Sequence, residues 1–345
     1  MGKDKTPRIR LSKKEYDFVQ NLRFLEKEAI KQGLDPEQVK HGWIKDKKTS
    51  LFVTNPLYKT EENKQLDEVR KEILEIVKKE SPKGVKKNYS EGNHLLIVDP
   101  ADVHIGKLCK AMETGDEYNS DIAIQRAKDG VRGVINKSKG FDVEKILFVA
   151  GNDILHIDTP KRTTTSGTPQ DTDGMWYTNF LKAVEFYKDI LTEISEIAPV
   201  HFVYNPSNHD YTNGFFLAQV VEAYFKNNDN ITFDISIAHR KYFKYHNSLI
   251  GTTHGDGAKW NDLPNLMAYE SRELWGSTDH HYFFTHHVHH EITKDLIGCT
   301  ISSFRSPSGT DSWHHRNGYT GVPKAVEGVL INNQFGQVAR ITNIF

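Results

Sequence analysis

The chain has 345 residues, of which 37% are hydrophobic and 26% are charged, proportions that are ordinary for a soluble globular protein. This length suffices for one large domain with an appendage, or for two domains. The sequence shows neither a signal peptide at Met1 nor an apolar run near the roughly 18 residues of a membrane-spanning helix, so we expect a cytoplasmic protein without a membrane partner. The two cysteines, Cys109 and Cys299, lack the spacing of a metal site and suit a reducing compartment.

The net charge of −1 hides an uneven distribution of charge along the chain. Residues 1–90 contain 22 Lys and Arg against 15 Asp and Glu, whereas residues 91–345 contain 23 against 31. A basic segment is compatible with a polyanionic partner such as DNA, although a solvated helical surface is the plainer explanation. An acidic body is expected if carboxylates gather around cations.

The spacing of apolar residues predicts a mainly helical extension over residues 1–90. A first helix over residues 13–33 is followed by a second, short one that ends near Gly42. Such a pair occurs in helix-turn-helix units that read DNA and, more often, in plain helical hairpins, so a DNA contact and a protein partner both stay open. A charged helix is predicted over 61–80 and a linker over 81–93, which places a domain boundary between residues 90 and 91.

From His94 onward, predicted strands and helices alternate, as in an α/β sheet. Residues 159–173, rich in Thr, Ser and Pro, predict a long loop, which beside a site is often a lid or a substrate contact. Strand-like runs after residue 298 suggest a second sheet packed on the first. The expected strands are 95–98, 144–150, 200–204, 241–246, 248–253 and 281–285, and the expected helices are 121–137, 175–197 and 215–227.

Five of the predicted strands are followed by side chains that can bind a metal ion. Asp102 and His104 come after the first, and residues two apart in an extended segment point the same way, so both can reach one cation. Open α/β sheets bind ligands at the carboxyl ends of their strands. The five clusters, in chain order, are Asp-x-His at 102–104, Gly-Asn-Asp-x-x-His at 151–156, Asn-His-Asp at 208–210, His-Gly-Asp at 254–256 and His-x-His at 287–289.

In order and spacing these clusters resemble the motifs of the calcineurin-like metallophosphoesterases, D-x-H, G-D-x-x-(D/H/R), G-N-H-(D/E), H and G-H-x-H. The resemblance covers about residues 94–290. It implies an α/β fold of four layers, α/β/β/α, with a small helical N-terminal appendage. It also implies two divalent transition-metal ions, manganese as first expectation and iron or zinc as alternatives. The implied ligands are Asp102, His104, Asp153 and His289 for the first ion, and Asp153, Asn208, His254 and His287 for the second.

The same resemblance implies three catalytic residues. His209 would contact the phosphate and assist the leaving group, and Asp210 would orient its imidazole. His156 would contact the scissile phosphodiester, because the stretch from Asp153 to His156 is similar to the G-D-L-F-H of the SbcD-like DNA repair nucleases.

Three positions depart from the family pattern. An extra Asn152 precedes Asp153, while Ser207 and His286 stand where the motifs have glycine. All three are positions that shape the backbone, so they put loop geometry in question. The run of histidines also leaves a shifted register open, with His286 or His290 as a ligand.

The resemblance favours a two-metal phosphodiesterase, and within that class a DNA nuclease similar to stand-alone relatives encoded by phages. A phosphatase or phosphodiesterase for small nucleotides is the alternative, and an interaction protein with a silent site is a third. Residues 313–316, Trp-His-His-Arg, would supply phosphate contacts or simply pack. A homo-oligomer is compatible with the sequence.

Overall fold

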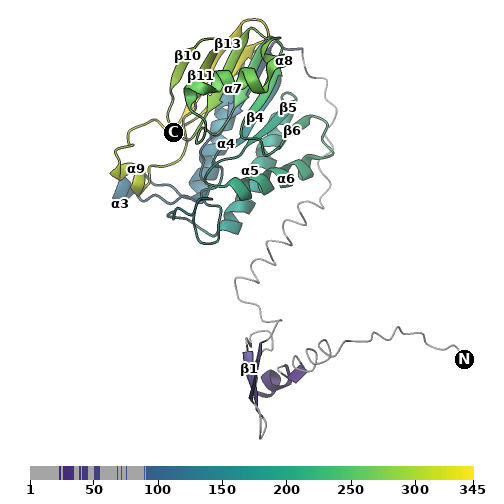
Figure 1. Ribbon diagram of the computed structural model, residues 1–345, viewed down its shortest axis with the longest axis vertical. Helices are drawn as coiled ribbons and strands as arrows, with labels where there is room; N and C mark the ends of the chain where they lie inside the picture. Colours follow the sequence, from purple (N-terminus) through teal and green to yellow (C-terminus); the bar gives the residue numbers. More distant parts are fainter. Residues whose placement is uncertain are drawn as a thin grey trace, which may run out of the picture. The chain divides into compact units, whose positions relative to one another are not determined.

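This computed structural model describes residues 91–345 throughout and, before them, residues 23, 24, 26–34, 39, 41–45, 50–54, 68, 71, 75 and 89. The chain divides into two compact units, Met1–Glu72 and Ile73–Phe345 (Figure 1). The expected boundary between residues 90 and 91 stays a prediction. Among the described residues, no helix is both long enough and apolar enough to cross a membrane.

The first unit contains a helix and a β-hairpin. Residues 23, 24 and 26–31 are helical, and Gly33 follows with a φ of 71°. Strand β1 (His41–Lys45) pairs antiparallel with β2 (Ser50–Thr54). The predicted short helix is therefore wrong at its end, because Gly42 lies in β1. The segments HGWIK and SLFVT are rich in the aromatic and β-branched residues that favour strands. Of the predicted helix over 61–80, only residues 68, 71 and 75 are described, and they are helical.

The second unit contains two sheets with helices on their outer faces (Figure 1). One sheet is built from β3 (His94–Asp99), β4 (Val143–Gly151), β5 (Val200–Asn205), β6 (Ile231–Asp234), β12 (Ala325–Asn332) and β13 (Gly336–Ile344). The other is built from β7 (Lys241–Tyr245), β8 (Ser248–Thr252), β9 (His280–Thr285), β10 (Thr293–Leu296) and β11 (Cys299–Ser303). The helices are α3 (Ala111–Thr114), α4 (Ser120–Lys137), α5 (Trp176–Ser195), α6 (Tyr211–Phe225), α7 (Leu263–Glu270), α8 (Arg272–Trp275) and α9 (Ser312–Arg316).

The strand order is β13-β12-β3-β4-β5-β6 in the first sheet and β10-β11-β9-β8-β7 in the second. Strands β3 to β6 run parallel, and so do β8, β9 and β11. The prediction that the strands after residue 298 form a second sheet is only partly right. Strand β11 joins the second sheet, but β12 and β13 extend the first one antiparallel. All eight residues of β12 are buried, which suits a position inside a sheet covered on both faces.

Alternation of side chains along β3 divides the apolar core between the two faces of its sheet. Leu96 and Val98 point to the cluster that packs under α4, α5 and α6, while Leu95 and Ile97 point to the cluster between the two sheets. A third cluster lies between the second sheet and α7, around Phe283. Three buried clusters separate four layers, so the predicted α/β/β/α sandwich is confirmed.

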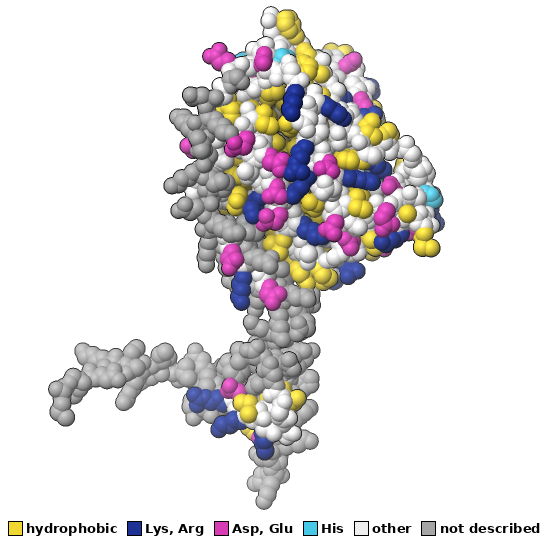
Figure 2. Space-filling view, turned by 180° about the vertical axis from the view of Figure 1, so that it is seen from behind, with side chains coloured by type: hydrophobic (Ala, Val, Ile, Leu, Met, Phe, Trp, Pro, Cys, Tyr) yellow, Lys and Arg dark blue, Asp and Glu magenta, His cyan; other side chains and the backbone are white. Residues whose placement is uncertain are grey.

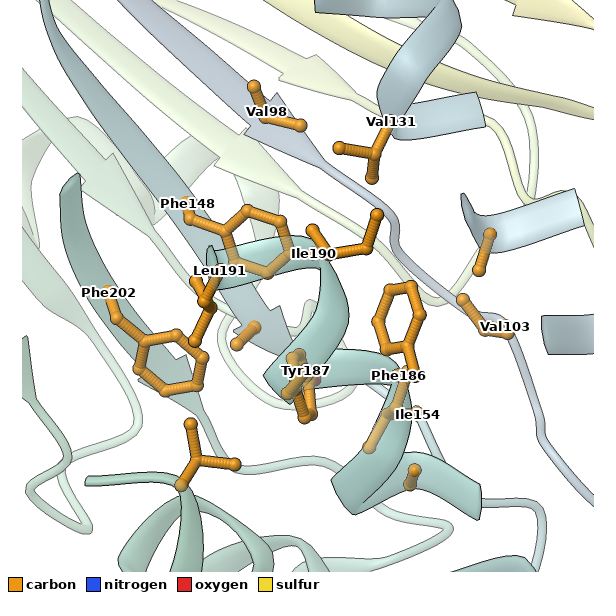
Figure 3. Packing of buried hydrophobic residues seen from close by; sticks show 14 of the residues in the cluster. Val98, Val103, Val131, Phe148, Ile154, Phe186, Tyr187, Ile190, Leu191 and Phe202 are labelled. Carbon is orange, nitrogen blue, oxygen red and sulfur yellow. The ribbon is translucent and has the colours of Figure 1, made fainter. Parts of the chain in front are cut away.

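Aromatic packing fixes α5 on the first sheet. Figure 3 shows Phe148 and Phe202, from neighbouring strands, beside Tyr187 of α5, with ring centroids 6.1 and 5.5 Å from that of Tyr187. All three side chains are fully buried or nearly so, and burial of each contributes about 1.5–3 kcal/mol to stability. This packing holds the carboxyl ends of β4 and β5 rigidly beside each other.

The predicted loop over 159–173 is a loop, and it is fastened to the body. Its Thr165 main-chain N–H donates to Asn208 at 3.2 Å, and its Thr165 hydroxyl donates to Asp158 at 2.8 Å. Asp158 also accepts the first main-chain N–H groups of α6, from Thr212 and Asn213. The loop is thereby held at the carboxyl end of β5, next to the expected site.

Candidate metal centre

The carboxyl ends of β3, β4 and β5 meet those of β8 and β9 from the other sheet. Two hydrogen bonds join the sheets directly behind these ends. Thr252 of β8 donates to Asn205 of β5 at 3.0 Å, and the ring of His286, after β9, lies 2.8 Å from the carboxylate of Asp99 in β3. The five motifs are thereby brought to one place, as their positions after strands predicted.

The backbone of the motifs is strained. In the described part of the chain eight non-glycine residues have positive φ, and six of them belong to the motifs. Each such residue costs on the order of 1–3 kcal/mol, and such residues cluster at active sites because the surrounding structure must enforce them. The six are Asp102 (51°), His104 (50°), Asn152 (51°), Asp153 (59°), His287 (72°) and His289 (60°).

The ligand atoms of the motifs form two groups, and in each group they lie within 4.8 Å of one another. In the first group, His289 Nε2 is 3.2 Å from His104 Nε2 and 3.6 Å from Asp102 Oδ1. In the second, His254 Nε2 is 3.2 Å from Asp153 Oδ2 and 2.9 Å from Asn208 Oδ1. The first group is Asp102, His104 and His289, and the second is Asp153, His254 and His287.

Asp153, a member of the second group, also faces the first. Its Oδ2 is 3.2 Å from His254 Nε2 of the second group and 4.0 Å from His104 Nε2 of the first. Its Oδ1 accepts the main-chain N–H of His209 at 2.9 Å, which fixes the carboxylate in this position. Asp153 thus faces ligand atoms of both groups, and its bridging role stays a prediction.

The surroundings of two carboxylate oxygens show whether these residues suit a cation. Asp102 Oδ1 is buried and accepts no hydrogen bond from the described residues, and Asp153 Oδ2, equally buried, faces His254 Nε2 at 3.2 Å. A buried acceptor without a donor is costly, and a cation satisfies it. Imidazole nitrogens mixed with carboxylate oxygens suit manganese, iron or zinc. The donor set thus fits divalent transition metals.

The electrostatics of the groups favour ligation. Burial lowers the pKa of His104 and of His289 well below the ordinary value, and neighbouring cationic groups lower it further, so both rings are neutral and can bind metal. Burial also works to lower the pKa of His254, but the adjacent Asp153 carboxylate outweighs it and raises that pKa to about 9. A proton on His254 would therefore compete with a cation for this ring.

Metal affinity should therefore increase with pH. Because the pKa of His254 is raised, a cation must displace a proton below about pH 9. Apparent affinity should rise by about tenfold per pH unit between pH 7 and 9 and level off above the pKa. Competition with a chromophoric chelator, repeated across this range, measures the slope. An affinity that does not change with pH would contradict the role given to His254.

Histidines 156 and 209 form a third group with His104. His156 Nδ1 lies 3.3 Å from His104 Nδ1, so His156 supports the side of the His104 ring that faces away from His289. The His209 ring stacks on that of His156 at 5.3 Å, and its Nδ1 lies 2.9 Å from the main-chain carbonyl of His156. That carbonyl accepts an Nδ1–H from His209 and leaves the other ring nitrogen free for chemistry.

Asp210 differs from its expected role. Its Oδ1 accepts from the Ser207 hydroxyl at 2.6 Å and its Oδ2 accepts from the Leu155 main-chain N–H at 2.8 Å, so the carboxylate does not hold the His209 ring. The Ser207 hydroxyl oxygen in turn accepts the main-chain N–H of Asp153 at 2.7 Å. Asp210 and Ser207 therefore position Asp153. Ser207, which stands where the metallophosphoesterase motif has glycine, supplies a hydrogen bond that glycine has no side chain to make.

Ser207→Ala should weaken the metal centre and the fold together. The change leaves the Asp153 main-chain N–H and one Asp210 oxygen without a partner, which should lower the free energy of unfolding by about 1–3 kcal/mol. Metal affinity should fall roughly 10- to 100-fold. Ser248→Ala is a matched control, because Ser248 is also buried but its hydroxyl has no partner among the described residues. Equal effects of both variants on metal affinity would contradict the role of Ser207.

The histidines of the run 286–290 face different partners. His286 points away from both ligand groups: its Nδ1 lies 2.9 Å from the Thr253 carbonyl and its Nε2 2.8 Å from Asp99. His290 Nδ1 lies 2.6 Å from the carbonyl of Val288. Among these histidines, His287 and His289 are the pair that the structure brings into the groups.

A buried ion pair near the first group had no signal in the motifs. Lys107 is 1% exposed, and its Nζ lies 2.9 Å from Asp311 Oδ2. Asp311 Oδ1 accepts the main-chain N–H of His314 at 2.8 Å and faces His314 Nδ1 at 2.7 Å. This pair ties the late loop that carries α9 to the end of β3. A lysine and an aspartate 204 positions apart share no sequence pattern that pairs them.

Comparison with known proteins finds likeness in structure but not in sequence. No family model matches the chain, and no curated protein does. A predicted phosphoesterase from Streptococcus pneumoniae is 13% identical over 74% of this chain and 94% of its own, with a TM-score of 0.32. Vps29 from Entamoeba histolytica, complexed with zinc, is 14% identical over 73% and 98%, with a TM-score of 0.31. A hypothetical protein from Pyrococcus horikoshii is 9% identical over 72% and 87%, with a TM-score of 0.34. Likenesses this distant assign neither a family nor an activity.

Proposed function

We propose that this chain is a metal-dependent phosphoesterase that hydrolyses phosphodiester bonds, and that DNA is its substrate. The observation that carries the proposal is the position of Asp153. Its carboxylate belongs to the second group of metal-binding side chains and also faces His104 of the first, while Asp102 of the first group keeps a buried oxygen without a hydrogen bond from the described residues. A single structural ion pair would need neither the second group nor the six strained residues.

Each site residue has a task in such a reaction. Two divalent cations held here would activate a water molecule and neutralise the charge on the phosphate oxygens. The ring of His209, oriented by the His156 carbonyl, would donate a proton to the leaving-group oxygen. Asp102, His104 and His289 would hold one ion, Asn208, His254 and His287 the other, and Asp153 both.

The preference for DNA rests on sequence. The motif from Asp153 to His156 resembles that of the SbcD-like nucleases, and residues 1–90 carry an excess of seven positive charges. On the face of the molecule in Figure 2, acidic and basic side chains are interspersed, without a basic patch among the described residues. Elsewhere on the surface, Lys182 and Asp121 form an exposed ion pair with their charged atoms 2.7 Å apart. We assign the proposed attraction for a polyanion to residues 1–90 because of their excess of positive charge.

The test of the proposal is a substrate panel offered to metal-reconstituted protein. The panel contains single-stranded DNA, double-stranded DNA, a bis-aryl phosphodiester and an aryl phosphomonoester, each with and without chelator. Chelator-sensitive cleavage of DNA and of the diester supports the proposal. Cleavage of the monoester alone would favour a small-molecule phosphatase. No turnover of any substrate with manganese, iron or zinc would contradict it.

Removal of residues 1–90 should weaken DNA binding without affecting the chemistry. Fewer phosphates would be neutralised, so the dependence of affinity on salt should become less steep. Turnover of the bis-aryl diester should persist, because the described ligand groups lie outside the segment. The slope of log affinity against log salt, measured for both proteins, checks this. An unchanged slope would make the segment a structural or partner-binding appendage.

A further inference from the structure

Two large aromatic side chains lie exposed beside each other in the late loop. Trp313 of α9 and Tyr319 just after it are 61% and 59% exposed, and their ring centroids are 5.7 Å apart with the rings inclined by 30°. Exposed aromatic surface of this size is unfavourable in water unless something covers it. The pair therefore offers an exposed aromatic surface on which a ligand could pack.

The aromatic pair is fixed next to the first ligand group. His314 lies between the aromatic pair and His289 of that group. Its ring stacks on the ring of His289, with centroids 5.2 Å apart and an interplanar angle of 19°, and its centroid is 5.1 Å from that of Trp313. Asp311 holds His314 through both its main-chain and ring nitrogens, and the buried Lys107 holds Asp311. The aromatic pair is thus anchored to the metal centre.

A permanent cation, Arg316, lies close to the pair in the chain. His315 and Arg316 occupy the last turn of α9 and are exposed. Aromatic faces combined with cations are the usual platform for single-stranded nucleic acid, because every base has a π-face and every nucleotide has a phosphate. A purely apolar partner would gain nothing from Arg316.

We propose that Trp313 and Tyr319 stack the base of the nucleotide whose phosphate lies at the metal centre. The inference rests on the proposed function and adds to it a nucleobase subsite. A phosphate held beside His289 leaves the sugar and base of that nucleotide to extend over His314 toward the aromatic pair. The same chemistry serves a free nucleotide and the end of a strand.

The test compares ligands that differ only in the base. Calorimetry on the full-length, metal-reconstituted chain would measure the binding of adenosine 5′-monophosphate and of ribose 5-phosphate. Stacking of one base is worth about 1–3 kcal/mol, so the nucleotide should bind about 5- to 150-fold more tightly. Trp313→Ala and Tyr319→Ala should each reduce this ratio, and the double variant should bring it close to one without changing the affinity for ribose 5-phosphate.

Tyr269→Ala is the matched control, because Tyr269 is 68% exposed and lies in α7 rather than α9. It should leave the ratio unchanged. If the wild type bound adenosine 5′-monophosphate and ribose 5-phosphate equally well, the proposed base platform would be wrong. The proposed phosphoesterase activity would be unaffected by that result. Failure of both ligands to bind would overturn the two proposals together.

A trinucleotide with phosphorothioate linkages, which resist hydrolysis, distinguishes the two sources of the base. If the platform serves a strand end, the trinucleotide should bind more tightly than the mononucleotide, and Trp313→Ala should reduce both affinities. If it serves free nucleotides, the added residues should bring no gain. Either result supports a base platform, whereas trinucleotide and mononucleotide affinities that are unaffected by the double variant would contradict it.

Discussion

Asp153→Asn is expected to lose metal and activity together. The neutral amide keeps the size of the carboxylate but has one oxygen and no charge, so it cannot serve two dications. The loss in metal affinity should exceed the roughly 10- to 100-fold that removal of a residue supporting a ligand costs. Elemental analysis of the purified variant, in parallel with diester turnover, measures both quantities.

A control for this variant must remove one negative charge close to the ligand groups without removing a ligand. Asp256 follows His254 closely and is exposed, and it belongs to neither ligand group. Asp256→Asn should keep both metals and most of the activity. If Asp153→Asn retained two ions and turned over substrate like Asp256→Asn, the position assigned to Asp153 between two cations would be wrong.

His209→Ala should separate chemistry from ligation. The ring of His209 does not belong to either of the two ligand groups that contain Asp153 or Asp102, and its Nδ1 is engaged by the His156 carbonyl. Both metals should therefore remain bound. Turnover of a diester with a poor leaving group should fall by about 10²- to 10⁴-fold, the range typical of lost general acid assistance.

The leaving group provides the internal control for His209. The aryloxide leaving group of an aryl diester departs with little need of a proton. The loss of turnover in His209→Ala should therefore be smaller on an aryl diester than on an alkyl diester. Equal deficits on alkyl and aryl diesters would give His209 a role in binding phosphate instead. Depletion of metal from this variant would show that His209 is a ligand and that His104, His156 and His209 form an ion site of their own.

The fold could be predicted where the sequence pattern is local. The run Leu95–Val98 sits in β3, and the predicted helix over 121–137 is α4. Their signals are periodicity and flanking breakers, which depend on neighbours in the chain. The convergence of the motifs followed from one further rule, that parallel strands place their carboxyl ends at one edge.

Features that depend on distant pairing could not be predicted in the same way. The largely apolar sequence of β12 is compatible with a strand in either sheet. Its pairing with β3, which the sequence does not reveal, places it in the first sheet. The link from Ser207 to Asp153 and Asp210 likewise depends on how two loops meet. Ser207 nevertheless stands at a departure from the family motif, and that departure marked the position as one to explain.

The most direct test of the account is the number and place of metal ions in the wild-type protein. Crystals of manganese-loaded protein, measured at a wavelength sensitive to the metal, should show two anomalous peaks per chain. One peak should touch Asp102, His104 and His289, the other Asn208, His254 and His287, and both should touch Asp153. A single peak, or peaks away from Asp153 in protein that cleaves a phosphodiester, would contradict the account.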